Sequence, residues 1–349
     1  MRRPILFLIT AFLLSLGVFA HADDLVQIRL GDYLEALRVQ AGIPGLAAVL
    51  IGPSDVQWQR GFGNQDVEHG APARPDTPFH VDGLTQVVTA ALLLRCDWYG
   101  RISLNDRVGT YAPTSPEAGA TVRQVLSHAS NGPGGLTFTY RLERLDALAP
   151  VVSACTDSSF RLGMAGLLDQ MIMFESVPGP DAVVPPAAND FPASTVDRYR
   201  GLMQRLALPY SIDAQLRPSP SQYAERTLTP ASGLISSALD FAHFDLALKR
   251  GALVGNEALA NAWTPPIGAN GQRLPHGLGW FVQTYNGEPI VWQFGAGDAA
   301  SALYIMAPRR GQTLILVANS SGLSKSFPLA AGDVTVSPFA RVFLGIFVR

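Results

Sequence analysis

The sequence has little charge and almost no lysine. Charged residues make up 15% of its 349 residues, the formal net charge at pH 7 is -2, and the lysines are Lys249 and Lys325 alone. Proteins that bind nucleic acid usually carry a basic excess, so no nucleic-acid partner is expected. Disordered chains are poor in apolar residues, whereas this chain is 48% hydrophobic, so it is expected to form a globular structure.

Cysteine is scarce as well, since Cys96 and Cys155 are the only two. Their spacing excludes a CxxC redox site and a cysteine zinc cluster. His243 and His276 have no second ligand at i+3 or i+4, so neither a metal nor another cofactor is expected. In an oxidising compartment the cysteine pair can form a disulfide, but buried free cysteine is also common, and the sequence favours neither state.

The long apolar run without charge lies at the beginning of the chain. Arg2 and Arg3 precede the mostly apolar residues 5–20, and Ala20-His21-Ala22 supplies small residues of the kind found before a signal-peptidase site. We therefore expect residues 1–22 to be an export signal and the mature protein to be periplasmic or extracellular. No later segment reaches the roughly 20 apolar residues of a spanning helix, so no membrane span is expected after signal removal.

Strand patterns lie at the two ends of the chain, with helical patterns between them. Residues 46–51 and 56–62 predict an antiparallel hairpin, and further strands are expected after residue 276. The helical periodicities cover residues 84–99, 160–173 and 236–250. This order predicts an α+β fold in which both ends of the chain form one sheet. We expect a sheet lobe of about residues 23–80 and 230–349 and a helical lobe of about 81–229.

Seven short phrases in a fixed order carry a family resemblance across residues 26–321. They are residues 43–47 (IPGLA), 61–63 with 66–68 and 75–79 (GFG, DVE and PDTPF), 104–108 (LNDRV), 125–130 (VLSHAS), 232–242 (SGLISSALDFA), 277–280 (GLGW) and 317–320 (VANS). In these phrases the chain resembles the serine β-lactamase and DD-peptidase superfamily, specifically its class C-like and esterase-like members. The resemblance implies an antiparallel sheet flanked by helices, an all-helical lobe, and a cleft between them.

The first catalytic motif that the resemblance implies is Ser-x-x-Lys at the start of a buried helix. The phrase Phe79-His80-Val81-Asp82 aligns the serine with Gly83 and the lysine with Gln86. Glycine has no nucleophile, and the amide of glutamine is not a usable base at neutral pH. The residues three positions before the two lysines are Leu246 and Gly322, so Ser-x-x-Lys occurs nowhere in the chain.

The other two motifs of the family are also incomplete. The resemblance aligns a Tyr-x-Asn motif with Tyr140 and Leu142, so the tyrosine is kept and the asparagine is lost. A half-buried aromatic with a locally bonded hydroxyl explains Tyr140 as well as a role in the cleft does. The Lys- or His-x-Gly motif aligns with Gln293 and Gly295, so its cation is missing. Gly295 either lets a substrate backbone approach or is a turn glycine.

The sequence therefore predicts an exported, catalytically inactive relative of these enzymes, a pseudoenzyme that binds a cell-wall peptide or a protein partner in the former active-site cleft. Gln86, Tyr140 and Gln293 are the side chains expected to line that cleft. The alternative is an ester or amide hydrolase that uses a non-standard nucleophile such as Thr85, or a water activated in the cleft. A structural or regulatory protein without a small-molecule site is a third hypothesis. The resemblance gives His128 a structural place.

Overall fold

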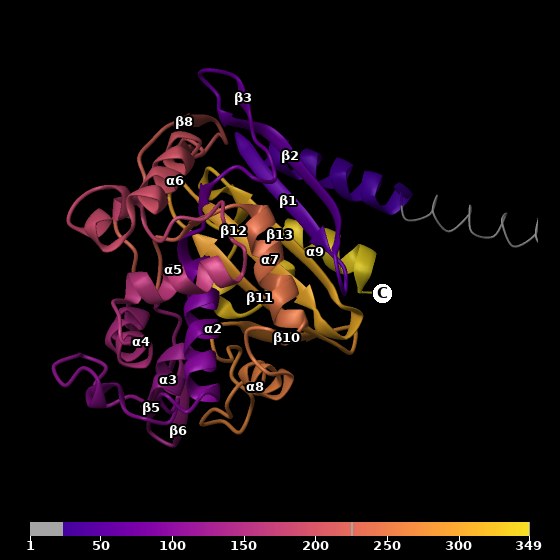
Figure 1. Cartoon of the computed structure of the whole chain (residues 1–349). Coiled ribbons are helices and arrows are strands. Elements are labelled where there is room, and N and C mark those ends of the chain that lie inside the picture. The colour runs from indigo at the N-terminus through magenta and orange to yellow at the C-terminus, as the bar shows by residue number, and fades with distance from the viewer. Residues whose placement is uncertain (1–23, 225, 349) are drawn as a thin grey trace, which may run out of the picture.

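The structure is a computed structural model that describes residues 24–224 and 226–348. The expected export signal, residues 1–22, lies outside the described residues. The molecule has a central antiparallel sheet with helices on both faces and a second, mainly helical lobe beside it (Figure 1). The predicted α+β fold with a flanked antiparallel sheet is thus confirmed.

The central sheet joins the two ends of the chain. Its seven strands run in the order β10-β11-β12-β13-β1-β2-β3. Their bounds are β1 Gly45–Ile51, β2 Val56–Asp66, β3 Ala71–Pro72, β10 Phe281–Tyr285, β11 Glu288–Ala296, β12 Ser301–Ala307 and β13 Gln312–Ala318. The N-terminal β1 pairs with the C-terminal β13, with Leu46 opposite Ala318 and Ile51 opposite Thr313. The predicted hairpin and the closure of the sheet by the two chain ends are both present.

Both faces of the sheet are covered, which explains why its central strands are apolar throughout. In β1, Ala47 and Val49 belong to the hydrophobic cluster on one face, whereas Leu46 and Ala48 belong to the cluster on the other. The first face packs against α2 (Thr85–Trp98) and α7 (Ala238–Lys249). The opposite face packs against the helix of residues 24–40 and α9 (Pro338–Phe347) (Figure 1).

The second lobe contains short helices and small hairpins. Its helices are α3 Val122–Leu126, α4 Ala149–Thr156, α5 Phe160–Gln170 and α6 Ala193–Gln204. Another helix, α8 Asn256–Ala262, lies below the sheet in the view of Figure 1. Two hairpins lie in the stretch expected to be helical: β5 Ala129–Gly132 with β6 Gly135–Phe138, and β7 Tyr210–Ile212 with β8 Pro218–Pro220. A further short pair joins β4 Phe79–His80 to β9 Ile235–Ser236. The lobe is therefore mainly rather than purely helical.

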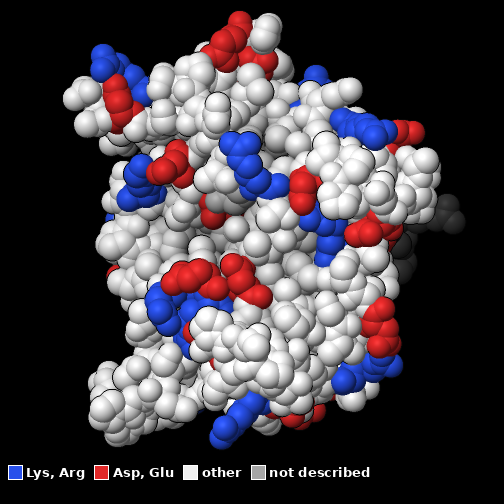
Figure 2. All heavy atoms as spheres, turned by 90° about the vertical axis from the view of Figure 1, so that its left-hand side faces the viewer, with Lys and Arg blue, Asp and Glu red and all other residues white. Residues whose placement is uncertain are grey.

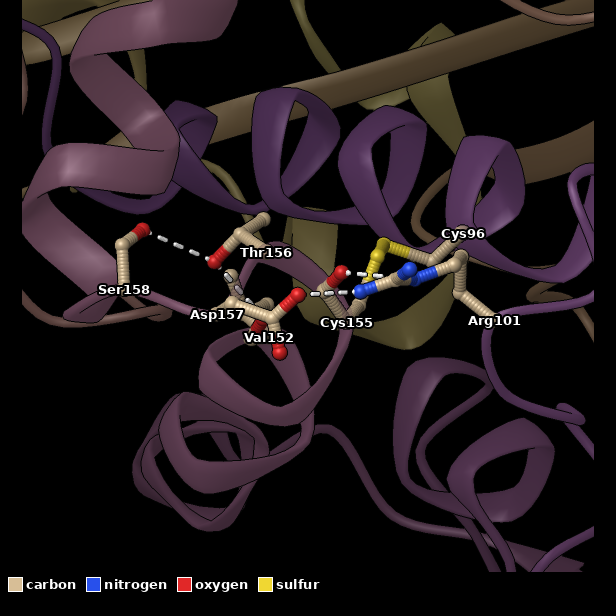
Figure 3. The surroundings of a disulfide bond; sticks show 7 residues. All are labelled: Cys96, Arg101, Val152, Cys155, Thr156, Asp157 and Ser158. Atoms are coloured by element: carbon tan, nitrogen blue, oxygen red, sulfur yellow. Dashed lines mark hydrogen bonds and ion pairs between the residues drawn. A yellow bond between two sulfur atoms is a disulfide. The ribbon is translucent and has the colours of Figure 1, made fainter.

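The two cysteines form a disulfide, which resolves the choice that the sequence leaves open. Cys96 of α2 is bonded to Cys155 of α4, with the Cα atoms 5.9 Å apart and a sequence separation of 59 (Figure 3). Arg101 lies against the bridge and donates to the Cys155 carbonyl at 3.2 Å and to Asp157. The bond ties the buried central helix to the outer helices, and a cross-link over so long a loop stabilises the fold mainly by restricting the unfolded chain.

The surface of the helical lobe reflects the low charge of the chain. Figure 2 shows charged side chains of both signs interspersed among much larger uncharged areas on the side that faces left in Figure 1. No single sign of charge dominates this face. Across the described residues, every helix is too short or too polar to span a bilayer.

Candidate functional site

Three distant segments of the chain bring the motif-matched residues together. Gly83 lies in the 3-10 turn Asp82–Leu84, and Gln86 follows in the first turn of α2. The Gln86 amide nitrogen donates to the Tyr140 hydroxyl at 2.8 Å, and that hydroxyl donates to Oε1 of Gln293 at a longer 3.4 Å. A Cβ atom on Gly83 would lie 3.0 Å from Cδ1 of Leu142. The sequence positions aligned by motif order are therefore neighbours in space.

Gly295 lets β11 lie directly against the turn that precedes α2. A Cβ atom at Gly295 would meet the Val81 carbonyl oxygen at 2.2 Å, and one at Gly297 would meet a carboxylate oxygen of Asp82 at 2.1 Å. Real Cβ atoms do not approach backbone so closely, so a side chain at position 295 would push the strand away from the turn. Close approach of the chain to itself accounts for Gly295.

Two histidines extend these contacts into a longer chain of hydrogen bonds. Nδ1 of His128 accepts from the Arg141 backbone N–H at 3.3 Å, so Nε2 carries the proton and donates to Oε1 of Gln86 at 3.1 Å. Nδ1 of His276 donates to the Gly277 carbonyl at 2.8 Å, which leaves Nε2 to accept from the Gln293 amide at 3.1 Å. We call His128, Gln86, Tyr140, Gln293 and His276 the neutral network.

Sequence reasoning missed the part that the two histidines play. His128 lies in the family phrase at residues 125–130, and the resemblance indicated a structural role for it but not its hydrogen bond to Gln86. His276 precedes the phrase at residues 277–280, but no motif aligned it with the catalytic positions. Its ring stands perpendicular to that of His128 with centroids 4.8 Å apart.

Every member of the neutral network is uncharged at neutral pH. Burial lowers the pKa of His128 well below its usual value, and repulsion from His276 and Arg144 lowers it further. Burial lowers the pKa of His276 to about 3, against the opposing effect of its hydrogen bonds to backbone carbonyls. The pKa of the Tyr140 hydroxyl is raised by burial, so it stays protonated.

The neutral network is an interior feature of the protein. Gln86, His128, His276 and Gln293 are each 0% exposed, and Gly83 is buried as well. The Tyr140 ring is half-buried and stacks on Phe294 with centroids 5.3 Å apart. Buried amide and imidazole groups are costly unless they are bonded, and here Gln86, Tyr140 and Gln293 bond chiefly to one another and to the histidines. Their expected role in holding a ligand stays a prediction.

The backbone beside the network is held in an unusual conformation at two places. Asp82 has a φ of 50° and His128 a φ of 51°, both in the left-handed region that non-glycine residues rarely adopt. Such conformations cost roughly 1–3 kcal/mol each and persist where surrounding contacts fix them. For His128 these contacts are the bonds from its ring to Gln86 and Arg141.

Neither lysine replaces the missing cation, because both are paired elsewhere. Lys249 on α7 forms a salt bridge of 2.7 Å with the buried Asp245, and it also donates to the Gly311 carbonyl. Lys325 pairs with Asp298 at 2.8 Å on the surface. The network thus has no ammonium group to lower the pKa of a nucleophile or to receive a carboxylate.

The hydroxyl of Thr85, the residue considered as an alternative nucleophile, is hydrogen-bonded to backbone groups. It donates to the Asp82 carbonyl at 2.7 Å and accepts from the Leu234 N–H at 3.2 Å, and the residue is 0% exposed. It has no acid–base partner, so it is a structural hydroxyl. Over residues 24–224 and 226–348, no three His, Cys, Asp or Glu side chains are grouped so as to hold a metal ion.

The sequence of this chain matches the model of a known protein family. A family model described as Beta-lactamase matches residues 25–170 and 175–335. Protein flp from Staphylococcus aureus (strain MW2) is 22% identical over 322 residues, which are 84% of this chain and 63% of flp, so this chain spans less than two thirds of that relative.

Solved structures share the fold. An octameric penicillin-binding protein homologue from Pyrococcus abyssi superposes with a TM-score of 0.72 at 19% identity, over 91% of this chain and 77% of that one. The D-alanine carboxypeptidase AmpC from Burkholderia cenocepacia gives a TM-score of 0.68 at 17% identity, over 92% and 99% of the two chains. At such identities the likeness speaks for the fold alone.

Proposed function

This chain belongs to the beta-lactamase family, and we propose that it is a member without acyl-transfer activity, an exported pseudoenzyme that acts by binding. The observation that carries the proposal is the bond from Gln86 to Tyr140 beside Gly83. Where the family resemblance implies a serine and a lysine, this chain has a residue with no side chain and an amide already engaged in the neutral network.

Loss of catalysis follows from the chemistry of these residues. Acyl transfer needs a nucleophile and a base that takes its proton, and Gly83 and Gln86 offer neither. Capture of a substrate carboxylate needs a cation or a set of free donors, whereas the Gln293 amide already donates to His276 and to the Gly279 carbonyl at 3.2 Å.

Binding is the function left to such a fold, and a cell-wall peptide or a protein partner is the proposed occupant of the former cleft. Leu142 and Tyr140 are the only partly exposed members among the motif-matched side chains, so a ligand would meet them first. One structural neighbour, AmpC from Burkholderia cenocepacia, is a D-alanine carboxypeptidase. A peptide that ends in D-alanine is therefore the first probe.

Export to the periplasm or the cell exterior is part of the proposal. The disulfide between Cys96 and Cys155 supports it, because disulfides persist in oxidising compartments and are rare in the cytosol.

The test is covalent labelling of the full mature chain with a fluorescent penicillin and a fluorophosphonate, read by intact-mass spectrometry. We expect no adduct on the wild-type protein. The matched control is the double variant Gly83→Ser with Gln86→Lys, which restores both groups and reports whether the probes reach the position. A stoichiometric adduct on any wild-type side chain would overturn the proposal.

A further inference from the structure

A cavity lies on the face of the sheet that is covered by the helix of residues 24–40 and α9, whereas α2, which carries Gln86, covers the other face. The cavity is bounded by the helix of residues 24–40, by α9, by the β7–β8 hairpin and by the segment after β13, and it has a volume of about 630 Å³. A second hollow of about 420 Å³ between the same two helices shares Leu37, Pro338 and Arg341 with it. We call these two adjacent hollows the α9 groove. Small-molecule sites commonly have volumes of about 300–1,000 Å³.

The floor and walls of the α9 groove are largely apolar. Leu37, Ile212, Phe327 and Phe339 line the larger hollow, and Leu216 at its rim is 47% exposed. The first four also belong to or pack against the hydrophobic cluster on this face of the sheet. Apolar surface left open in a groove is typical of a binding site for an apolar group.

The charged side chains that line the α9 groove are two cations, Arg341 and Lys325, and one carboxylate, Asp213. Arg341 lies where the two hollows meet, and its Nη1 donates to the Thr335 carbonyl at 2.9 Å. In the part of the chain that the structure describes, no carboxylate forms an ion pair with this guanidinium. Lys325 also lines the groove, and its pair with Asp298 is exposed to solvent on both sides, so it contributes little energy and is easily exchanged.

The single carboxylate of the groove lining is already neutralised. Asp213 pairs with Arg217 at 2.7 Å and accepts backbone N–H bonds from Gln215 and Arg217 at 2.9 Å each. An incoming anion would therefore meet the guanidinium of Arg341, and the ammonium of Lys325 once it exchanges its exposed partner Asp298, beside an apolar groove. A guanidinium with most of its donors unused forms strong two-point hydrogen bonds with a carboxylate.

From this combination we propose that the α9 groove binds a long-chain carboxylate of the fatty-acid type. The carboxylate pairs with Arg341, assisted by Lys325, and the hydrocarbon chain lies in the larger hollow against Ile212, Phe327 and Phe339. The lining of this site includes none of the motif-matched residues, so the proposal does not depend on the fate of the former active site. It makes the protein a carrier or sensor of a lipid-like acid.

The experiment is displacement of a fluorescent polyene fatty acid, cis-parinaric acid, from the purified mature chain at micromolar concentrations. Laurate should compete, 1-dodecanol should compete about tenfold less well because it lacks the charge, and dodecyltrimethylammonium should compete least. Arg341→Gln should weaken laurate binding about tenfold and leave dodecanol unchanged, whereas Arg309→Gln in an exposed turn should alter neither.

A second pair of variants tests the channel. Leu37→Trp should fill the groove and abolish binding of all three competitors, whereas Val39→Trp, at a 62% exposed position of the same helix, should leave binding intact. The proposal fails if parinaric acid does not bind saturably, if Leu37→Trp binds it normally, or if the cationic detergent competes as well as laurate. It also fails if sedimentation shows that Leu37→Trp only separates a dimer of the wild-type chain, which would make the groove a contact between copies.

Discussion

Two clusters of buried polar side chains in this protein satisfy their hydrogen bonds in different ways: one contains an ion pair and the other contains only neutral groups. Around Asp245 a full ion pair is kept: Lys249 lies 2.7 Å from one carboxylate oxygen, and the other accepts from the hydroxyls of Tyr304 and Thr313 at 2.6 and 2.9 Å. The neutral network, by contrast, is built from amides, imidazoles and a phenol and contains no charged member. Both clusters join helices to the sheet, and apart from the half-buried Tyr140 their side chains are almost wholly buried.

The two clusters differ in whether a buried charge has a charged partner. The charged cluster shows that this fold accommodates a buried lysine when a carboxylate is paired with it. At position 86 no such carboxylate partner is bonded to the side chain, and the chain has a neutral amide there. At this place hydrogen bonds between neutral groups satisfy the buried polar atoms without a charge.

The largest expected effect comes from breaking the charged cluster. Lys249→Met leaves Asp245 buried without its cation, and loss of one partner of a buried pair costs about 3–5 kcal/mol. Urea unfolding at pH 7 measures the loss. Adding Asp245→Asn in the same chain should recover part of it, because the amide oxygen still accepts from Tyr304 and Thr313 without the charge. If Lys249→Met lowers the free energy of unfolding by less than about 1 kcal/mol, this ion pair does not stabilise the fold as a buried pair should.

Placing a charge in the neutral network is the converse experiment. Gln86→Lys should destabilise the fold by about 2–4 kcal/mol at pH 7, because burial disfavours the ammonium. The folded pKa of that lysine would be lowered, so stability should rise as the pH rises toward 10. Gln59→Lys, at an exposed position of β2, is the control and should change little. Equal stability of the two variants would mean that the network is open to water.

Acid should weaken the neutral network through its histidines. The pKa of His276 is about 3 in the folded protein, below its usual 6.5, so unfolding takes up a proton in this interval. The stability that neutral His276 contributes is complete above pH 6.5 and falls toward pH 3, by up to about 1.4 kcal/mol per pH unit. The free-energy difference between wild type and His276→Gln should therefore shrink by about 2 kcal/mol from pH 6.5 to 4.5.

Another titrating group acts in the opposite direction over part of this range. Burial raises the pKa of Asp240 to about 7, so its contribution favours the fold as the pH falls from about 7 to 4. It is present in both proteins and cancels in their difference. Parallel stability curves for wild type and His276→Gln would contradict the assignment of a neutral histidine.

The smallest expected effect is at Gly83 itself. A Cβ there would meet Leu142 at 3.0 Å and the Phe294 carbonyl at 3.2 Å, so these neighbours must shift by a few tenths of an ångström. Gly83→Ala should cost about 1 kcal/mol or less, and Gly83→Ala with Leu142→Val should cost less than Gly83→Ala alone. A thermal melt gives the comparison. A loss of several kcal/mol would mean that the turn before α2 cannot hold any side chain.

The sequence predicted which motif positions meet at the site better than it predicted the hydrogen bonds that join them. Motif order was enough to bring Gly83, Gln86 and Gln293 together, and the continuous apolar run of residues 46–51 was enough to predict a strand. The role of His276 was not predictable, because it depends on hydrogen bonds between side chains brought together only by tertiary packing. The choice between free and bonded Cys96 likewise needed the distance to Cys155, which spacing along the chain does not give.

Nitrogen-15 NMR of the histidine rings between pH 7 and 4.5 tests the neutral network most directly. We predict that His276 remains neutral throughout, that His128 does not titrate near its usual pKa, and that the two rings are opposite tautomers, with the proton on Nε2 of His128 and on Nδ1 of His276. If either ring titrates near pH 6.5, or if both show the same tautomer, the chain of neutral bonds described for this site does not exist.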